Sequence, residues 1–283
     1  MPIPNPQPPT PSPRSIAFIG GGNMARSLVG GLVAQGTQPA SIRIAEPADP
    51  LREALVADFG VKAYPTAAEA VAGAGVWVFA IKPQVMRMVC ETLAPLAQAS
   101  RPLVVSTAAG ITSTQLEHWL GGGLGVVRAM PNTPALLGAG ATGVYANANV
   151  DANGRAVAEQ LLAATGPATW IADEMQMDAV TALSGSGPAY VFLLAEVMIA
   201  AGEAEGLPAD AARALALQTV LGAARMLVES GEAPDELRKR VTSPNGTTQA
   251  ALDSFERDGF RAIVARAIHA ARERGRELSA MND

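Results

Sequence analysis

The sequence predicts a two-domain α/β protein, with a doubly wound N-terminal domain followed by an all-helical one. Short β-type runs alternate with helical runs from Ser15 to about Ile171, and the β signals end after Asp173. A length of 283 residues also favours about two domains. The boundary is expected near residue 172, between domains of residues 14–172 and 173–283. Residues 1–13 form a proline-rich leader outside both domains.

The first domain is predicted from seven short runs of strand composition. Helical stretches lie between them, such as Met24–Gln35, where Met24, Leu28 and Leu32 recur at a helical spacing. Strands that alternate with helices predict βαβ units on a parallel sheet covered on both faces. The seven runs are Ile16–Ile19, Ile42–Ala45, Val76–Ile81, Leu103–Ser106, Val126–Ala129, Gly143–Ala146 and Ala168–Ile171.

The second domain is predicted from four helical runs without strand signals. The last run places Phe260, Ile263 and Val264 on one face and carries arginines near its end, where cations favour the helix dipole. The four helices are expected at Pro188–Glu205, Pro208–Glu229, Thr247–Arg257 and Gly259–Leu278.

Composition argues against several classes of partner. A net charge of −5 without a long basic run speaks against nucleic acid and anionic membranes. No consecutive apolar run approaches the ~18–20 residues of a membrane span, because Glu196 interrupts the most apolar segment. Charged residues make up only 17%, below the ~25% of typical domains, so a hydrophobic oligomer interface is expected.

Cysteine and histidine are too scarce for a disulfide or a metal cluster. Cys90 is the single cysteine, which suits a reducing cytoplasm, and His118 and His269 are the only histidines. The proline-rich leader lacks the basic start and apolar segment of a signal peptide. We therefore expect a cytoplasmic protein without a metal.

A glycine turn follows the first predicted strand and opens a helix. The segment reads G-x-G-x-x-A, which in this context predicts dinucleotide binding rather than an ordinary glycine-rich turn. Gly20 permits the tight turn, Gly22 lets the backbone approach a pyrophosphate, and Ala25 allows close helix–strand packing. Asn23 and Met24 begin the helix, whose N-terminus favours phosphate.

Glu46 ends the second predicted strand and is the expected ribose ligand. A carboxylate there can accept hydrogen bonds from both ribose hydroxyls of NAD and would repel a 2′-phosphate. Arg43 and Arg52 are close in sequence and could offset that repulsion. NADH is therefore the predicted preference, with NADPH open, and a solvated loop glutamate is the alternative interpretation.

Three further segments are expected at the carboxyl ends of strands, where ligands bind in such sheets. Lys82 could approach a phosphate or a carboxylate, although a surface lysine would look the same. Small residues after Ser106 would let a flat nicotinamide lie close to the backbone, and Asn132 offers an amide-recognising group in a loop that also reads as a structural turn. The cofactor-binding candidates here are Ile81, Lys82, Pro83, Ala108, Ala109, Gly110 and Asn132.

The stretch TSPNGTT interrupts the helical half at residues 242–248. Pro244 fixes one φ angle, and Asn245-Gly246 forms a turn that can visit left-handed conformations. Thr247 and Thr248 then present free N–H groups at the start of a helix, which can receive a small carboxylate without arginine. An ordinary capped helix is the alternative that this stretch leaves open on its own.

Seven segments together resemble one family, the pyrroline-5-carboxylate reductases. They are GGGNMA, AIKP, AAG, RAMPNTP, LSGSGPAYVF, GAARMLVESGEAPDEL and VTSPNGTTQAAL, and the resemblance covers nearly the whole chain except the leader. It implies NAD(P)H-dependent reduction of the cyclic imine 1-pyrroline-5-carboxylate to L-proline. It also implies a Rossmann domain and a helical domain that forms a homodimer, with assembly to a decamer left open.

The resemblance also implies roles for residues of the helical half. Thr248 matches the threonine that hydrogen-bonds the ring nitrogen, and Glu174 matches a position lining the same pocket. The substrate carboxylate site is expected at Ser243, Asn245, Gly246 and Thr247. A protonated imine already accepts hydride readily, so catalysis is expected to depend on alignment, with Thr248 orienting the ring nitrogen.

The sequence departs from the family pattern at two positions, and two alternative functions are considered. Asn245 replaces a usual glycine, and Ala233 stands where members often carry histidine. A β-hydroxyacid dehydrogenase would need a catalytic lysine in the helical half, where Lys239 in a polar run is the only one. A non-catalytic redox sensor would bind the dinucleotide without reducing an imine. The reductase is the favoured interpretation.

Overall fold

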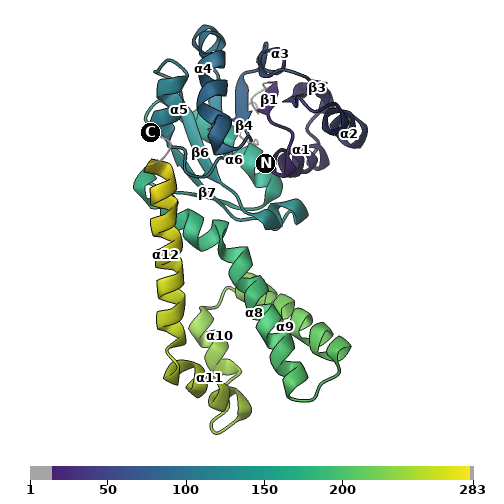
Figure 1. Cartoon of the computed structure of the whole chain (residues 1–283), viewed down its shortest axis with the longest axis vertical. Coiled ribbons are helices and arrows are strands. Elements are labelled where there is room, and N and C mark those ends of the chain that lie inside the picture. The colour runs from purple at the N-terminus through teal and green to yellow at the C-terminus, as the bar shows by residue number, and fades with distance from the viewer. Residues whose placement is uncertain (1–14, 281–283) are drawn as a thin grey trace, which may run out of the picture. The chain divides into compact units, whose positions relative to one another are not determined.

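The computed structural model describes residues 15–280, so the predicted leader of residues 1–13 lies outside the described residues. The chain forms two compact units (Figure 1). The first comprises residues up to Gly185 together with those from Arg272, and the second comprises Ser186–Ala271. The first unit thus continues beyond the expected boundary at residue 172 and also includes the C-terminal end of the chain.

The first unit is built on one eight-stranded sheet with the order β3-β2-β1-β4-β5-β6-β7-β8 (Figure 1). The chain moves outward from β1 in both directions, so the crossover point lies between β1 and β4. This is the place where doubly wound sheets bind ligands. The strands are β1 Ile16–Ile19, β2 Ile42–Ala45, β3 Lys62–Tyr64, β4 Val76–Phe79, β5 Leu103–Ser106, β6 Val126–Met130, β7 Thr142–Ala146 and β8 Ala168–Trp170.

Helices cover both faces of this sheet, as the doubly wound prediction requires. Alternation along β1 places Phe18 in one buried core and Ala17 and Ile19 in the other. The first core packs under α1 Asn23–Ala34, α2 Asp49–Phe59 and α6 Ala152–Leu162, and the second under α3 Ala67–Val71, α4 Pro83–Ser100 and α5 Ser113–Trp119.

The sheet differs from the prediction at one edge and at β3. β7 pairs with β6 in antiparallel orientation, so the sheet is mixed rather than wholly parallel. The reason is the connection, a 3-10 turn at Thr133–Leu137 (η2) that contains no crossover helix. β3 was not predicted, because its three residues are only exposed or half-buried and give no apolar pattern.

Short helical turns follow β8 and lead to the end of the first unit's N-terminal part at Gly185. They are η4 Glu174–Gln176, α7 Met177–Val180 and a π turn at Thr181–Gly185 (η5). Gly143 on β7 leaves room for α7, because a Cβ there would lie 2.3 Å from Val180 Cγ1. Two more 3-10 turns are η1 Pro39–Ser41 and η3 Ala163–Thr165.

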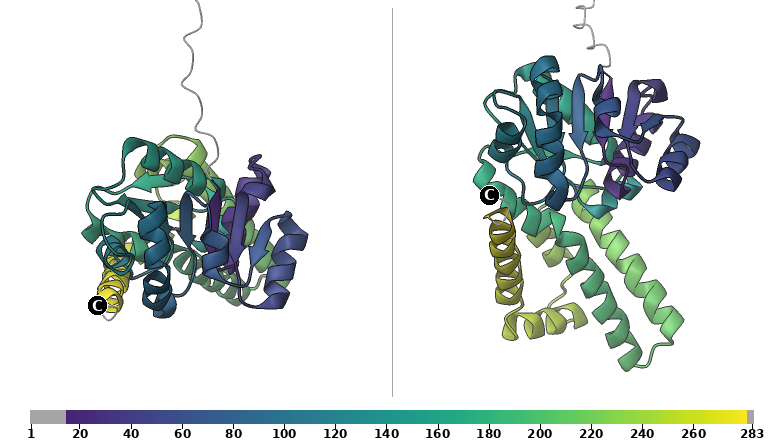
Figure 2. Two further views of the ribbon diagram at one scale, coloured as in Figure 1. Left: turned by 90° about the horizontal axis from the view of Figure 1, so that it is seen from above. Right: turned by 45° about the horizontal axis from the view of Figure 1, so that its top comes forward.

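The second unit is helical, as predicted. α8 and α9 run side by side in both figures (Figures 1 and 2). The polar α10 was not predicted, since its only buried residue is Leu237. The helices are α8 Gly187–Ala204, α9 Ala209–Glu229, α10 Pro234–Arg240, α11 Thr247–Arg257 and α12 Phe260–Ala280, whose end from Arg272 belongs to the first unit.

α8 and α9 leave an apolar surface exposed. Only Ala195 is buried on α8, whereas Phe192 is 65% exposed and Leu221 on α9 is 54% exposed. By length and composition alone, two helical stretches, Glu174–Ala204 and Ala209–Glu229, could cross a membrane. No membrane span was predicted from the sequence, and apolar helices of soluble proteins pass the same test. Within residues 15–280, this apolar surface remains exposed.

Candidate active site

The glycine turn packs tightly against the end of β4. Gly20 has a φ of +101°, which disfavours any residue with a side chain. A Cβ at this position would also lie 2.6 Å from the Ala80 carbonyl oxygen and 2.7 Å from Ile81 Cγ2. The tight turn expected at Gly20 is confirmed, and it brings the glycine turn and the segment from Ala80 onward together.

Gly22 faces open space at the start of α1. It is the N-cap residue of the helix, with ordinary φ and ψ of −70° and −175°, and no side chain caps the first turn. A Cβ built on Gly22 would meet no atom within 4 Å. Ala25, by contrast, is fully buried against the sheet. Uncapped amides beside a position without a side chain form a cradle suited to an anion.

Glu46 lies beneath this turn and is 8% exposed. Its Oε2 accepts a hydrogen bond from the Gly21 amide at 3.1 Å, and its Oε1 accepts one from the Ala48 amide at 3.0 Å. The alternative of a solvated loop glutamate is therefore wrong. Each carboxylate oxygen retains a lone pair that a ribose hydroxyl could use.

The two arginines near Glu46 are engaged elsewhere. Arg52 Nη1 donates to the Glu46 carbonyl oxygen at 2.9 Å, and its other nitrogen pairs with Asp49. Arg43 donates to the Glu69 and Ala70 carbonyl oxygens, at 2.7 Å each. Neither guanidinium contacts the Glu46 carboxylate, so its negative charge is not offset by a direct ion pair.

The other cofactor candidates of the first unit follow β4 and β5. Lys82 is the N-cap residue of α4, and Pro83 is the first residue of that helix. Ala108 is 5% exposed, and Gly110 has a φ of +72°. Since β2, β1, β4 and β5 are parallel neighbours, their carboxyl ends share one edge of the sheet. The structure therefore gathers these candidates along the edge that carries the glycine turn.

Both polar atoms of the Asn132 side-chain amide form hydrogen bonds within the protein. Its Nδ2 donates to the Ser184 carbonyl oxygen at 2.9 Å, and its Oδ1 accepts from the Ala141 amide at 2.9 Å. The residue thus connects the loop after β6 with the π turn at 181–185. A contact between Asn132 and the cofactor stays a prediction.

The SPNGTT segment forms a tight turn that leads into α11 in the second unit. The Gly246 amide donates to the Ser243 carbonyl oxygen at 3.0 Å, and Asn245 adopts a φ of 57°. The positive φ expected at Asn245 is thus confirmed, and with Pro244 it fits a type II turn. Gly246 caps α11 without a side chain, and no acidic residue occupies its first turn. Like α1, this helix begins with uncapped amides.

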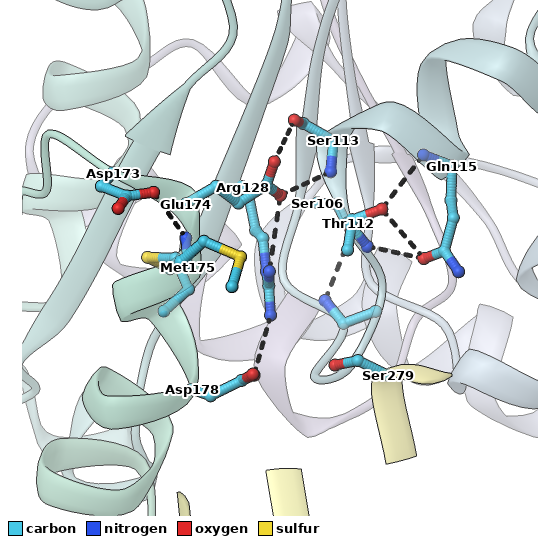
Figure 3. Close-up of polar contacts among 12 residues, drawn as sticks. Ser106, Thr112, Ser113, Gln115, Arg128, Asp173, Glu174, Met175, Asp178 and Ser279 are labelled. Carbon is cyan, nitrogen blue, oxygen red and sulfur yellow. Dashed lines mark hydrogen bonds and ion pairs between the residues drawn. The ribbon is translucent and has the colours of Figure 1, made fainter. Parts of the chain in front are cut away.

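Glu174 takes part in a polar network of the first unit (Figure 3). Its carboxylate accepts hydrogen bonds from the Ser113 amide at 2.6 Å and from Ser113 Oγ at 2.5 Å. Arg128 lies between two acids, with its nitrogens 3.4 Å from Glu174 and 3.6 Å from Asp178. The network lines a cleft of about 610 Å³ that the end of α12 also lines, through Arg272, Arg276 and Ser279.

Arg128 was not assigned a role from the sequence. The available signal was a charged residue within the apolar strand run Val126–Met130, where it is 4% exposed. Charged side chains are rarely buried unless they are paired, so such a residue indicates partners elsewhere in the chain.

The expected site residues therefore fall into two groups. The cofactor candidates and Glu174 belong to the first unit, whereas residues 243–248 belong to the second. The lining of the cleft around Glu174 comes entirely from the first unit. Within the described residues, no group of three histidine, cysteine or acidic side chains is arranged to hold a metal ion.

Two family models match successive parts of the chain, and the second of these parts contains the whole second unit. Residues 174–278 match the pyrroline-5-carboxylate reductase dimerisation family. Residues 15–110 match the family described as NADP oxidoreductase, coenzyme F420-dependent. The second unit is therefore a dimerisation domain, and the first carries an oxidoreductase nucleotide-binding segment.

Relatives match over almost their full length. A pyrroline-5-carboxylate reductase from Pseudomonas aeruginosa is 54% identical over 264 residues, covering 93% of this chain and 96% of that protein. The structure of one from Coxiella burnetii matches with a TM-score of 0.92 and 41% identity, covering 95% and 99% of the two chains. A Plasmodium falciparum pyrroline carboxylate reductase, solved with NADP bound, matches at a TM-score of 0.82 and 28% identity, covering 94% and 98%.

Proposed function

The chain belongs to the pyrroline-5-carboxylate reductase family, and we propose on that premise that it reduces 1-pyrroline-5-carboxylate to L-proline with NADH or NADPH. The observation that carries the proposal is the start of α11. There Asn245 adopts a positive φ and the N-cap residue Gly246 provides no side-chain cap, so the first amides of α11 and its two threonines are available to a small carboxylate. The first unit has its own helix start without a side-chain cap, that of α1, which suits the pyrophosphate of a dinucleotide.

The first unit has the features that a dinucleotide requires. A side chain at Gly22 would fill the space that a pyrophosphate would use, and the α1 amides there have no cap. We propose that Gly20, Gly22 and the first residues of α1 hold the pyrophosphate, that Glu46 holds a ribose, and that Ala108–Gly110 lie beside the nicotinamide. The reduced nicotinamide, when bound, supplies the hydride.

The second unit would hold and orient the imine. We propose that Ser243, Asn245, Gly246 and Thr247 bind the substrate carboxylate, and that the Thr248 hydroxyl hydrogen-bonds the ring nitrogen. No side chain caps the start of α11, so its first amides are available to a ligand. Because a protonated imine accepts hydride readily, the main task of the protein is to align the imine carbon and to exclude water.

The contacts of Glu174 bear on its expected role in the substrate pocket. Its carboxylate is already held by Ser113 and faces Arg128, which supports a bracing role in the first unit. We propose that Glu174 shapes the cleft that it lines rather than binding the ring nitrogen itself.

Glu46 favours NADH over NADPH in this proposal. A 2′-phosphate would approach a buried carboxylate whose neighbouring arginines are bound to carbonyl groups and to Asp49. Replacement of Glu46 by glutamine removes the charge but keeps one oxygen for a backbone amide. The ratio of kcat/KM for NADPH to that for NADH should therefore rise in Glu46→Gln, and an unchanged ratio would remove Glu46 from nucleotide selection.

The exposed apolar faces of α8 and α9 support a homodimer through the second unit. Further assembly of dimers to a decamer, in the cytoplasm, follows from the family resemblance alone. Light scattering of the purified protein would distinguish monomer, dimer and decamer, and a monomeric active enzyme would overturn this part of the proposal.

The assay for the reaction itself is the loss of reduced-nicotinamide absorbance on adding 1-pyrroline-5-carboxylate. Thr248→Ala should lower kcat with little change in nucleotide affinity, because the hydroxyl would contact the imine and not the cofactor. If both quantities fell to the same degree, the role of Thr248 would be wrong.

A further inference from the structure

The loop after β6 is tied to the point where the chain leaves the first unit. Asn132 is the N-cap residue of η2, yet its side chain does not cap that turn. Instead Nδ2 donates to the Ser184 carbonyl oxygen, 52 residues along the chain, and Oδ1 accepts from the Ala141 amide. One side chain thus holds three backbone segments together.

The receiving segment has an unusual backbone. Thr181–Gly185 forms a π turn between α7 and α8. Its hydroxyls turn back on the preceding helix, with Thr181 Oγ1 donating to the Met177 carbonyl oxygen at 2.9 Å and Ser184 Oγ donating to that of Val180 at 3.0 Å. π turns are rare and occur frequently at functional sites. Here the π turn is the last element before the chain enters the second unit.

A second contact joins the same two segments. A Cβ on Gly185 would lie 2.7 Å from Met130 Cε, so the end of β6 packs directly on this glycine. Met130 and Asn132 therefore contact adjacent residues, Gly185 and Ser184. The exit of the chain toward α8 is thus held by a hydrogen bond and by packing against the end of a central strand.

We propose that Asn132 is a positioning residue for hydride transfer, acting through the π turn at 181–185. The inference rests on the proposed function, in which the first unit holds the nicotinamide and residues 243–248 of the second unit hold the imine. The chain passes from the first unit to the second after Gly185 and returns to the first within α12, after Ala271. Removal of the Asn132 amide would leave the Ser184 carbonyl group without this donor and would loosen the start of the second unit. Misplacement of reacting groups by 1 Å can cost about 10²-fold in rate.

This role differs measurably from a direct contact with the cofactor. A cofactor ligand at Asn132 would make nucleotide affinity fall when it is removed. A positioning residue would leave that affinity intact and lower kcat instead, because the side chain of Asn132 bonds to Ser184 and Ala141 and not to the glycine turn or Glu46.

The experiment compares three variants with a matched control in the full-length protein. Asn132→Ala removes both hydrogen bonds, and Asn132→Asp keeps an acceptor for Ala141 but places a carboxylate oxygen against the Ser184 carbonyl oxygen. Gly185→Ala disturbs the same junction from the other side, through Met130. The control is Gln98→Ala, which loses equivalent amide-to-carbonyl bonds to Leu120 and Gly122, of 2.9 and 3.0 Å, in a loop that precedes β6.

The measurements are kcat, KM for the imine, the Kd for NADH and hydrogen–deuterium exchange of residues 181–187. We expect kcat to fall about tenfold or more in the Asn132 variants and less in Gly185→Ala. The Kd for NADH should stay within about twofold of wild type, with faster exchange at 181–187, and Gln98→Ala should keep wild-type kcat.

Wild-type kcat in Asn132→Ala, or an equal loss in Gln98→Ala, would overturn the inference. A rise in the Kd for NADH that matches the fall in kcat would instead make Asn132 a cofactor ligand. Failure of the wild-type protein to reduce the imine would defeat the proposed function separately. Exchange at 181–187 would then still decide whether Asn132 holds the turn.

Discussion

Replacement of Gly20 or Gly22 by alanine separates the two tasks of the glycine turn. In Gly20→Ala, a residue with a side chain would occupy a φ of +101°, a conformation that costs of order 1–3 kcal/mol. Its Cβ would also press on the Ala80 carbonyl oxygen at 2.6 Å, and this backbone cannot move easily because the Ala80 amide donates to Ile19. We expect a loss of about 3 kcal/mol in the stability of the first unit.

Gly22→Ala should behave in the opposite way. Its φ and ψ suit alanine, and the new Cβ would have no neighbour within 4 Å. Loss of glycine at an N-cap costs less than about 1 kcal/mol, so the fold should persist. The methyl group would instead occupy the space proposed for the pyrophosphate, and NADH affinity should fall at least about tenfold, or roughly 1.4 kcal/mol.

Thermal melting and NADH titration test this pair directly. Gly20→Ala should lower the melting temperature by roughly 6–12 °C, since 1 kcal/mol corresponds to about 2–4 °C for a unit of this size. Gly22→Ala should melt close to wild type but bind NADH weakly. Wild-type NADH affinity in Gly22→Ala would refute the assignment of this turn to the pyrophosphate, and a wild-type melting temperature in Gly20→Ala would refute the steric reasoning.

Three other changes have defined outcomes. Asn245→Gly should keep wild-type KM for the imine, because glycine tolerates the positive φ. Asn245→Ala should raise this KM, because alanine would strain the turn at a cost of about 1 kcal/mol. Equal KM values in the two variants would contradict the role of the turn. Glu174→Gln should lower the melting temperature, because Ser113 and Arg128 lose a charged acceptor worth roughly 1–3 kcal/mol. An unchanged melting temperature would contradict the proposal that Glu174 braces the first unit. Burial raises the pKa of Cys90 from 9.0 to about 12, so the native thiol should resist alkylation at pH 8 until the protein unfolds. Stability should then fall as pH rises between 9 and about 12, where only the unfolded thiol ionises, and rapid native-state alkylation at pH 8 would contradict this burial.

The parts of the fold that the sequence predicted are those with strong local signals. β1 and β2 were predicted with their observed bounds because apolar β-branched residues dominate them. The glycine turn indicated the first strand–helix unit. β3 and α10 were missed because they bury little apolar surface, and periodicity depends on burial. The direction of β7 was also missed, since alternation along a strand carries no information about its orientation.

Long-range contacts explain most of what the sequence could not give for the site. Glu46 was predicted to be at the cofactor site, but its bonds to the Gly21 and Ala48 amides depend on how two strands lie in the sheet. The bond from Asn132 to Ser184 joins residues far apart in the chain. Such pairings arise from tertiary packing, and only the motifs they connect were visible beforehand.

The most direct test of the central claim is the oxidation of NADH and NADPH, side by side, on adding 1-pyrroline-5-carboxylate to the purified protein. We predict turnover with both nucleotides and a higher kcat/KM with NADH, as the buried Glu46 carboxylate favours. Faster turnover with NADPH would keep the reaction and contradict the role of Glu46. Binding of either nucleotide without any loss of its absorbance would contradict the reductase function itself.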